Sequence, residues 1–201
     1  MADYEVLLFD VLGVLAEDSE TITEAVLEAI DMTNDELWGF WVQSPAVREF
    51  DSGRISGQVF AERLMSEMDH PATPEAFLEL FGRWISGLYE GTEELLSRIP
   101  STYKKACLSN TNEILWPPVR DEYGLGGLLD AYYLSHEMGM LKPDQEAFEY
   151  VVNDLDIAPE RIAFFDDLKL NVNAAKEAGM DAFHTRGLKD LSNELEWLGV
   201  I

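Results

Sequence analysis

The spacing of apolar residues divides the chain into two kinds of segment. Between residues 16 and 88, apolar residues recur three and four positions apart, as one face of a helix requires. This pattern predicts an almost entirely helical stretch with helices at 23–30, 35–42, 56–68 and 73–88. From residue 92 onward, short apolar runs alternate with amphipathic stretches. The predicted strands are 104–108, 131–134, 162–165 and 182–184, and the predicted helices are 93–99, 113–123, 145–155, 172–178 and one after residue 184.

A further strand is predicted at residues 4–9, ahead of the helical stretch. Strands that alternate with helices indicate an α/β fold, a Rossmann-like doubly wound parallel sheet. We therefore expect an α/β core domain of residues 1–15 and 89–201, into which residues 16–88 are inserted as an α-helical bundle cap. The aromatic and methionine side chains of this insert are expected to form its own core: Trp38, Trp41, Phe60, Met65, Phe77, Phe81 and Trp84.

Charge narrows the set of partners. The chain of 201 residues has 39 acidic and 14 basic residues, a formal net charge of −25. Such a surface repels nucleic acid and anionic membranes and favours a monomer. An anionic ligand would need a local positive charge from a metal, a lysine or a helix N-terminus. The acidity is compatible with a saline habitat and equally with an ordinary solvated surface.

Two further features bear on location. Cys107 is the single cysteine, so no internal disulfide can form. No apolar stretch approaches the ~20 residues needed to span a bilayer, and no basic segment precedes the first apolar run. We expect a cytoplasmic protein.

Asp10 is the first candidate for chemistry. It follows the apolar run of residues 6–9 and is followed by a glycine at position 13. Reactive groups of open α/β sheets lie at the carboxyl ends of strands, so Asp10 is a candidate nucleophile or metal ligand. Taken alone, it could equally cap the next segment.

Two other predicted strand ends carry polar groups. Ser109 and Asn110 follow the strand at 104–108, where a hydroxyl and free backbone N–H groups suit a phosphate, or simply cap a helix. Lys142 precedes Pro143, the predicted first residue of a helix, and its ammonium group could neutralise a phosphate or a carboxylate. A solvated surface lysine is the alternative.

The strand at 162–165 ends in a pair of carboxylates, Asp166 and Asp167, with Asn171 four residues later. Adjacent buried carboxylates repel each other unless a cation or protons intervene. Together with Asp10, this pair would make a hard oxygen site suited to Mg²⁺. A nucleophile, a hydroxyl, a lysine and a metal in one crevice are typical of phosphoryl transfer.

In this order, the four elements resemble the motifs of the haloacid dehalogenase superfamily, subfamily I, with a small helical cap. The motifs are Phe9-Asp10-Val11-Leu12-Gly13-Val14, Leu108-Ser109-Asn110, Lys142-Pro143, and Phe165-Asp166-Asp167 with Asn171 and Gly179. The run Leu108–Asn112, the stretch Tyr133-Leu134-Ser135 with Gly139, and Phe164–Asp167 are similar to the bacterial sugar-1-phosphate phosphatase branch (α-glucose-1-phosphate type).

The resemblance implies a Mg²⁺-dependent phosphatase acting on a small phosphorylated metabolite, with a sugar phosphate favoured. Asp10 would attack phosphorus and become an aspartyl phosphate. The phosphoryl oxygens would be held by Ser109, Asn110 and Lys142. The implied metal ligands are Asp10, the backbone carbonyl of Leu12, Asp167 and Asp166, with Asn171 supporting the loop.

Leu12 departs from the family pattern, because most phosphatases of the superfamily have an acid–base Asp at this position. Loss of a positioned proton donor typically costs about 10²–10⁴ in rate. The substrate could have a good leaving group, or Glu17, Asp18 or His136 could take over the proton. Alternatively, the chain could be a metal-independent 2-haloacid dehalogenase or a catalytically impaired binding or regulatory protein. Specificity is expected at the cap mouth, near Glu17, Asp18, Trp41 or Arg54.

Overall fold

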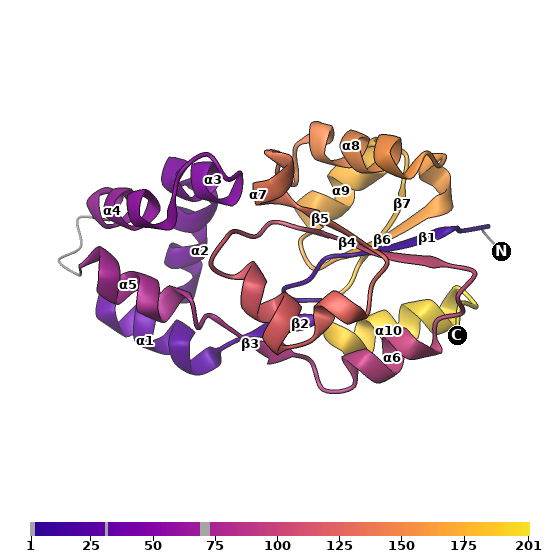
Figure 1. Ribbon diagram of the computed structural model, residues 1–201, viewed down its shortest axis with the longest axis horizontal. Coiled ribbons are helices and arrows are strands. Elements are labelled where there is room, and N and C mark those ends of the chain that lie inside the picture. The colour runs from indigo at the N-terminus through magenta and orange to yellow at the C-terminus, as the bar shows by residue number, and fades with distance from the viewer. Residues whose placement is uncertain (1–2, 31, 69–72) are drawn as a thin grey trace.

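The computed structural model describes residues 3–30, 32–68 and 73–201 of the chain. Two lobes lie side by side along the long axis of the molecule (Figure 1). One lobe contains a parallel sheet with helices on both faces, and the other contains helices α1–α5. His70, to which the sequence assigned no role, lies outside the described residues.

A five-stranded sheet forms the first lobe and has the order β5-β4-β1-β6-β7. All of its neighbouring strands pair in parallel. Its strands are β1 (Val6–Phe9), β4 (Lys104–Ser109), β5 (Ala131–Leu134), β6 (Ile162–Asp166) and β7 (Asp181–His184). The predicted doubly wound parallel α/β fold is confirmed.

The central strand β1 is buried on both faces, which is why its sequence is a continuous apolar run. Leu7 and Phe9 face one hydrophobic cluster, and Val6 and Leu8 face another. Helices α6 (Thr92–Arg98) and α10 (Gly187–Trp197) cover the first face, and α8 (Gln145–Leu155) and α9 (Lys169–Glu177) cover the second (Figure 1).

In the described residues, the second lobe consists of five helices, named here the inserted helices. They are α1 (Glu20–Ile30), α2 (Asn34–Gln43), α3 (Pro45–Asp51), α4 (Gly57–Glu67) and α5 (Pro74–Phe81). Ser44, Ser56 and Thr73 begin α3, α4 and α5 by accepting hydrogen bonds from backbone N–H groups of the first turn.

The prediction that residues 16–88 are almost entirely helical is wrong at the two ends of this stretch. Two short antiparallel strands, β2 (Ala16–Asp18) and β3 (Ile85–Leu88), connect the inserted helices to the sheet lobe. The helix predicted to run to residue 88 ends at Phe81, with Gly82 as its C-cap. The apolar residues beyond Gly82 also fit helical spacing, so the local pattern could not reveal a strand whose partner is about 70 positions away.

Aromatic side chains fill the centre of the inserted helices, as predicted. Phe60, Phe77, Phe81 and Trp84 are buried with Met65, and Trp41 packs against them while partly buried. Trp38 is a correction, because it is 40% exposed and only its edge contacts Trp84.

Two other helix predictions are wrong. The helix predicted at 113–123 is irregular: residues 113–115 form a turn, 116–117 are α-helical, and η1 (Pro118–Glu122) is a short π-helix, since Pro117 and Pro118 lack the N–H groups that a regular helix needs. Pro143 is not helical, because α8 begins at Gln145. The remaining short elements are η2 (Leu125–Gly127), α7 (Ser135–Met138) and η3 (Pro159–Arg161).

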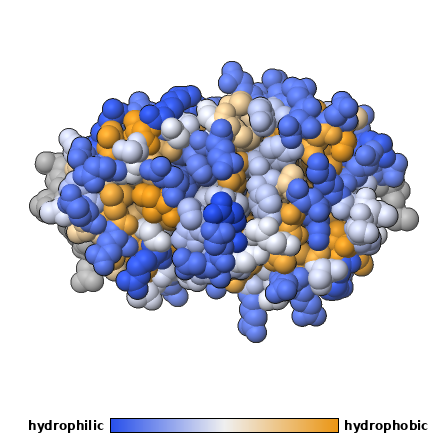
Figure 2. All heavy atoms as spheres, in the orientation of Figure 1, coloured by the Kyte–Doolittle hydropathy of each residue, from blue (hydrophilic) through white to orange (hydrophobic). Residues whose placement is uncertain are grey.

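Hydrophilic side chains cover most of the face seen in Figure 2, and hydrophobic side chains form small, separate groups on it. This surface agrees with the net charge of −25. Within the described ranges, no helix combines the length and apolar character that a bilayer crossing demands.

Candidate active site

The four motifs of the sequence meet at one edge of the sheet. Asp10 directly follows β1, Ser109 ends β4 and Asp166 ends β6, so all three lie at carboxyl ends of parallel neighbouring strands. The backbone N–H of Asp10 donates to the carbonyl of Phe165 at 2.8 Å. This bond continues the β1–β6 ladder and sets Asp10 beside the Asp166–Asp167 pair.

Lys142 forms ion pairs with the acidic residues at two of these strand ends, Asp10 and Asp166. Its Nζ lies 2.9 Å from Oδ1 of Asp10 and 2.7 Å from Oδ2 of Asp166. The Lys142 side chain is 1% exposed, so solvent barely screens either ion pair. The alternative of a solvated surface lysine is therefore excluded.

Asp166 has every hydrogen bond that its buried position demands. Its Oδ1 accepts from the backbone N–H of Leu168 at 2.8 Å and from Nδ2 of Asn171 at 3.0 Å, while Oδ2 receives Lys142. Asn171 thus holds the Asp166 carboxylate in place. The Nδ2 of Asn171 also lies 3.1 Å from Oδ2.

Asp167 completes a group of three carboxylates. Asp10, Asp166 and Asp167 each offer an oxygen within 4.8 Å of the others, close enough to share one cation. Gly13 permits this approach, because a Cβ atom there would lie 2.7 Å from Cγ of Asp167. The φ angle of Gly13 is also +87°, a conformation that favours glycine.

The charges in this group are unbalanced, since one ammonium group faces three carboxyl groups. Burial, opposed by Lys142 and reinforced by Asp166 and Asp167, raises the pKa of Asp10. Burial also raises the pKa of Asp167, and the Asp166 charge adds to the effect. Burial alone would lower the pKa of Lys142, but the charges of Asp10 and Asp166 raise it, so Lys142 stays protonated. A further cation would relieve the remaining negative charge.

The loop after β4 is fixed by side-chain contacts. Ser109 is buried at the end of β4. The side chain of Asn110 accepts from the backbone N–H of Lys142 at 2.9 Å and donates to its carbonyl at 2.8 Å. Because these bonds occupy the Asn110 amide, its side chain positions Lys142. The hydroxyl of Ser135 bonds the backbone of Thr111 in both directions.

Several residues near the cluster were not identified from the sequence as functional. Nε2 of His184 lies 2.8 Å from the backbone carbonyl of Asp167, and the N–H of Thr185 donates to the carbonyl of Asp166. The N–H of Gly187 donates to the carbonyl of Gly13 at 2.7 Å. The only available signal was their place after the strand predicted at 182–184.

The candidates for a replacement proton donor and those for substrate specificity lie on several different elements. Glu17 and Asp18 are exposed on β2. His136 is half-buried on α7, its Nδ1 atom has no partner among the described residues, and burial lowers its pKa. Trp41 belongs to the aromatic centre of the inserted helices, and Arg54 is exposed after α3. The side chain of Leu12 packs against the hydrophobic cluster under the sheet.

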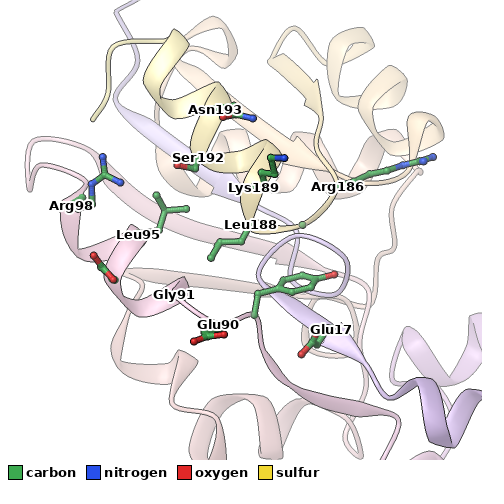
Figure 3. Close-up of a pocket in the computed structure, with 13 residues that line it drawn as sticks. Glu17, Glu90, Gly91, Leu95, Arg98, Arg186, Leu188, Lys189, Ser192 and Asn193 are labelled. Carbon is green, nitrogen blue, oxygen red and sulfur yellow. The ribbon is translucent and has the colours of Figure 1, made fainter.

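A cleft of about 940 Å³ lies between α6 and α10, and none of the three clustered carboxylates lines it. Figure 3 shows Lys189, Ser192 and Asn193 of α10 on one side of it and Glu90, Leu95 and Arg98 on the other. Asp10 and Lys142 do not line this cleft. It approaches the site at Arg186, whose charge acts on Asp167, and at Gly187.

The chain belongs to the haloacid dehalogenase-like hydrolase family, whose model matches residues 4–179. It is 24% identical over 196 residues to a D-ribitol-5-phosphate phosphatase from Bacteroides thetaiotaomicron. The match covers 94% of this chain and 95% of that protein. The family expected from the motifs is therefore confirmed.

Solved structures confirm the fold. A HAD-like hydrolase from Porphyromonas gingivalis superposes with a TM-score of 0.80 at 21% identity, covering 98% of both chains. A HAD family enzyme from Bacteroides thetaiotaomicron, solved with magnesium and inorganic phosphate, gives a TM-score of 0.73 at 23% identity. That match covers 91% of this chain and 94% of the other.

Proposed function

We propose that this protein is a Mg²⁺-dependent phosphatase that hydrolyses a small phosphorylated metabolite through an aspartyl phosphate on Asp10. The observation that supports this proposal most directly is the cluster of three carboxylates. Asp10, Asp166 and Asp167 each offer an oxygen within 4.8 Å of the others, and the buried ammonium group of Lys142 pairs with Asp10 and Asp166. Nucleophile, cation and carboxylates at one sheet edge suit phosphoryl transfer, in which positioning and charge neutralisation do most of the work. The D-ribitol-5-phosphate phosphatase to which the chain is similar supports the same reaction class.

The donor set fits Mg²⁺, which prefers a few carboxylate oxygens and keeps several waters. Asp10, Asp167 and the backbone carbonyl of Leu12 would hold the ion, with Asp166 beside them. When bound, it would supply positive charge next to the phosphoryl oxygens and oppose the raised pKa of Asp10.

The side chains have distinct roles in this proposal. Asp10 attacks phosphorus while its Oδ1 stays bound to Lys142 and to the backbone N–H of Val11 at 2.7 Å. Lys142 neutralises charge on the transferred group, and the Ser109 hydroxyl donates to a phosphoryl oxygen. Water then attacks phosphorus, releasing inorganic phosphate and the Asp10 carboxylate.

The inserted helices would act as a cap. In this division, residues 1–15 and 89–201 form the catalytic domain and residues 16–88 shield the reaction from water and contact the substrate's leaving group. A sugar phosphate fits the proposal, and an anomeric sugar 1-phosphate would place least demand on a proton donor. The protein is proposed to act as a cytoplasmic monomer with no nucleic-acid or membrane partner.

The direct test compares wild type with Asp10→Asn on a panel of phosphate esters with Mg²⁺ and with EDTA. Wild type should release phosphate only with the metal, and Asp10→Asn should lose activity on every ester, because an amide cannot form the aspartyl phosphate. Asp181→Asn is the matched control, since Asp181 is the first residue of β7 and lies at the amino ends of the parallel strands, away from Asp10.

Other outcomes would decide against the proposal. Equal activity of Asp10→Asn would remove the proposed nucleophile. Halide release from 2-haloacids that persists in EDTA would identify a dehalogenase. Ligand or Mg²⁺ binding without turnover on any ester would identify a binding protein.

A further inference from the structure

Cleavage of an alkyl phosphate needs a proton source, because the departing oxygen is otherwise a strongly basic alkoxide. The described cluster contains no free donor. Lys142 is held between Asp10 and Asp166, and the three carboxyl groups form the proposed metal site. The side chain at position 12, two residues after Asp10, is the apolar Leu12.

We infer that the carboxyl group of Asp51, at the end of helix α3, protonates the leaving oxygen of the substrate. The inference rests on the proposed phosphatase function and deepens it. Among the described residues, the buried charged side chains are Asp10, Lys142, Asp166 and Asp51. The first three belong to the cluster, so Asp51 is the buried charge that the reaction has not yet used.

A side chain in the loop after β4 forms a hydrogen bond with Asp51. Nδ2 of Asn112 donates to Oδ1 of Asp51 at 2.8 Å, and this bond is buried. Oδ1 of Asn112 accepts from the backbone N–H groups of Ile114 and Leu115, which fixes the amide orientation. Asn112 is three residues after Ser109, so Asp51 is tied to the loop that would bind the phosphoryl group.

The end of α3 also contacts the neighbouring loops at the same sheet edge. Gly53 approaches the backbone carbonyl of His136 so closely that a Cβ atom there would lie 2.3 Å from its oxygen. Arg48 forms an ion pair with Asp144, two residues after Lys142. Helix α3 therefore packs beside α7 (Figure 1) and brings Asp51 to the side of the sheet where the motifs converge.

Asp51 is suited to carry a proton. Burial raises its pKa to about 6, and the hydrogen bond from Asn112 opposes this effect only in part. Among the described residues, the side-chain hydrogen bond of Asp51 involves Oδ1 and not Oδ2. That oxygen can therefore carry the proton while Oδ1 remains bound to Asn112.

The donors expected from the sequence are less suitable. Glu17 and Asp18 are exposed on β2, outside the buried cluster. Burial lowers the pKa of His136, so its ring is neutral at pH 7 and is a weak acid.

The proton balance closes over both steps. As Asp10 forms its bond to phosphorus and the ester P–O bond breaks, the proton on Oδ2 of Asp51 moves to the departing oxygen, leaving the Asp51 carboxylate. That carboxylate then takes a proton from the water that attacks the aspartyl phosphate. Inorganic phosphate leaves, and both aspartates return to their starting forms.

The test measures kcat/KM for Asp51→Asn on a series of aryl and alkyl phosphates of increasing leaving-group basicity. Asparagine is isosteric and can still accept from Asn112, but it cannot donate an acidic proton. For alkyl phosphates we expect a loss of about 10²–10⁴-fold, and for p-nitrophenyl phosphate, which needs little protonation, a loss below about tenfold. Retained aryl phosphatase activity shows that the variant is folded.

Glu49→Gln is the matched control, because Glu49 lies on the same helix and its partly exposed side chain pairs with Arg63. It should leave the leaving-group dependence unchanged. An equal loss of kcat/KM for Asp51→Asn on all esters would indicate a structural role and overturn the inference, as would no loss on any ester. Failure of the proposed function would look different, since wild type would then release phosphate from none of the series.

Discussion

The sheet lobe and the inserted helices bury different kinds of side chain. At the carboxyl edge of the sheet, Asp10, Lys142 and Asp166 are buried charges that touch one another. The inserted helices bury an aromatic cluster in which Phe50 and Phe60 stack with centroids 4.4 Å apart. Their single buried charge in the described ranges is Asp51, where α3 meets the sheet lobe.

This difference follows from backbone geometry. Parallel strands end at a common edge with unpaired backbone groups that can hold charged side chains, as the N–H of Leu168 holds Asp166. A helix satisfies its own backbone, and its buried face is stabilised mainly by apolar packing. In the proposed enzyme, the sheet lobe therefore supplies the nucleophile and the cation site. The inserted helices supply shielding, contacts with the substrate and the inferred proton donor, Asp51.

Removing the central ammonium group should have the largest effect. Lys142→Met would leave Asp10 and Asp166 buried without a countercharge, and breaking such a pair costs about 3–5 kcal/mol. Urea unfolding in EDTA should show this loss of stability. Phosphatase activity should fall by about 10²–10³-fold or more. Lys189→Met is the control, because Lys189 is exposed on α10. Unchanged stability would mean that the two ion pairs do not form in solution.

Replacing the buried charge of the inserted helices should have the opposite effect on stability. The pKa of Asp51 is about 6 in the folded protein and about 3.9 in an unfolded chain. Because the folded state binds this proton more tightly, its contribution is complete below pH ~4 and is lost as pH rises to ~6. At pH 7, Asp51→Asn should therefore be more stable than wild type by up to about 3 kcal/mol. Urea unfolding of both proteins from pH 4 to 7 measures the difference, and a gap that stays constant with pH would contradict it.

The smallest effect is expected at the contact between the two regions. Arg48 and Asp144 form an ion pair across it, but their side chains are 51% and 39% exposed. Such pairs contribute between 0 and about 1 kcal/mol and weaken with salt. A double-mutant cycle of Arg48→Gln and Asp144→Asn, measured by urea unfolding at low and high salt, should give a coupling within this range. A coupling above it that is insensitive to salt would mean that the pair is shielded from solvent.

Local pattern predicted much of the fold. Continuous apolar runs such as Val6–Phe9 identify buried parallel strands, and capping residues such as Ser56 and Thr73 identify helix starts. Residues 16–18 and 85–88 were misassigned because their strand character arises from pairing with each other. The helix predicted at 113–123 is irregular because Pro117 and Pro118 have no backbone N–H to donate.

The candidate active site, like the fold, was predictable from the sequence only in part. The order of Asp10, Ser109, Lys142 and Asp166-Asp167 along the chain, each at a strand end, was sufficient to predict the family and a shared crevice. Their roles in catalysis and metal binding remain predictions. Contacts between distant segments, such as Asn110 with Lys142 and Asn112 with Asp51, have no local signature.

The sequence by itself determined most of the helices and strands, which strand ends carry charge, and the family to which the chain belongs, because these depend on residue type and short-range spacing. Only the tertiary structure decided which of the many acidic residues are buried away from solvent. Asp51 looks like any other of the 39 acidic residues in the printed chain. Its burial and its raised pKa exist only because α3 packs against a loop about 60 residues away.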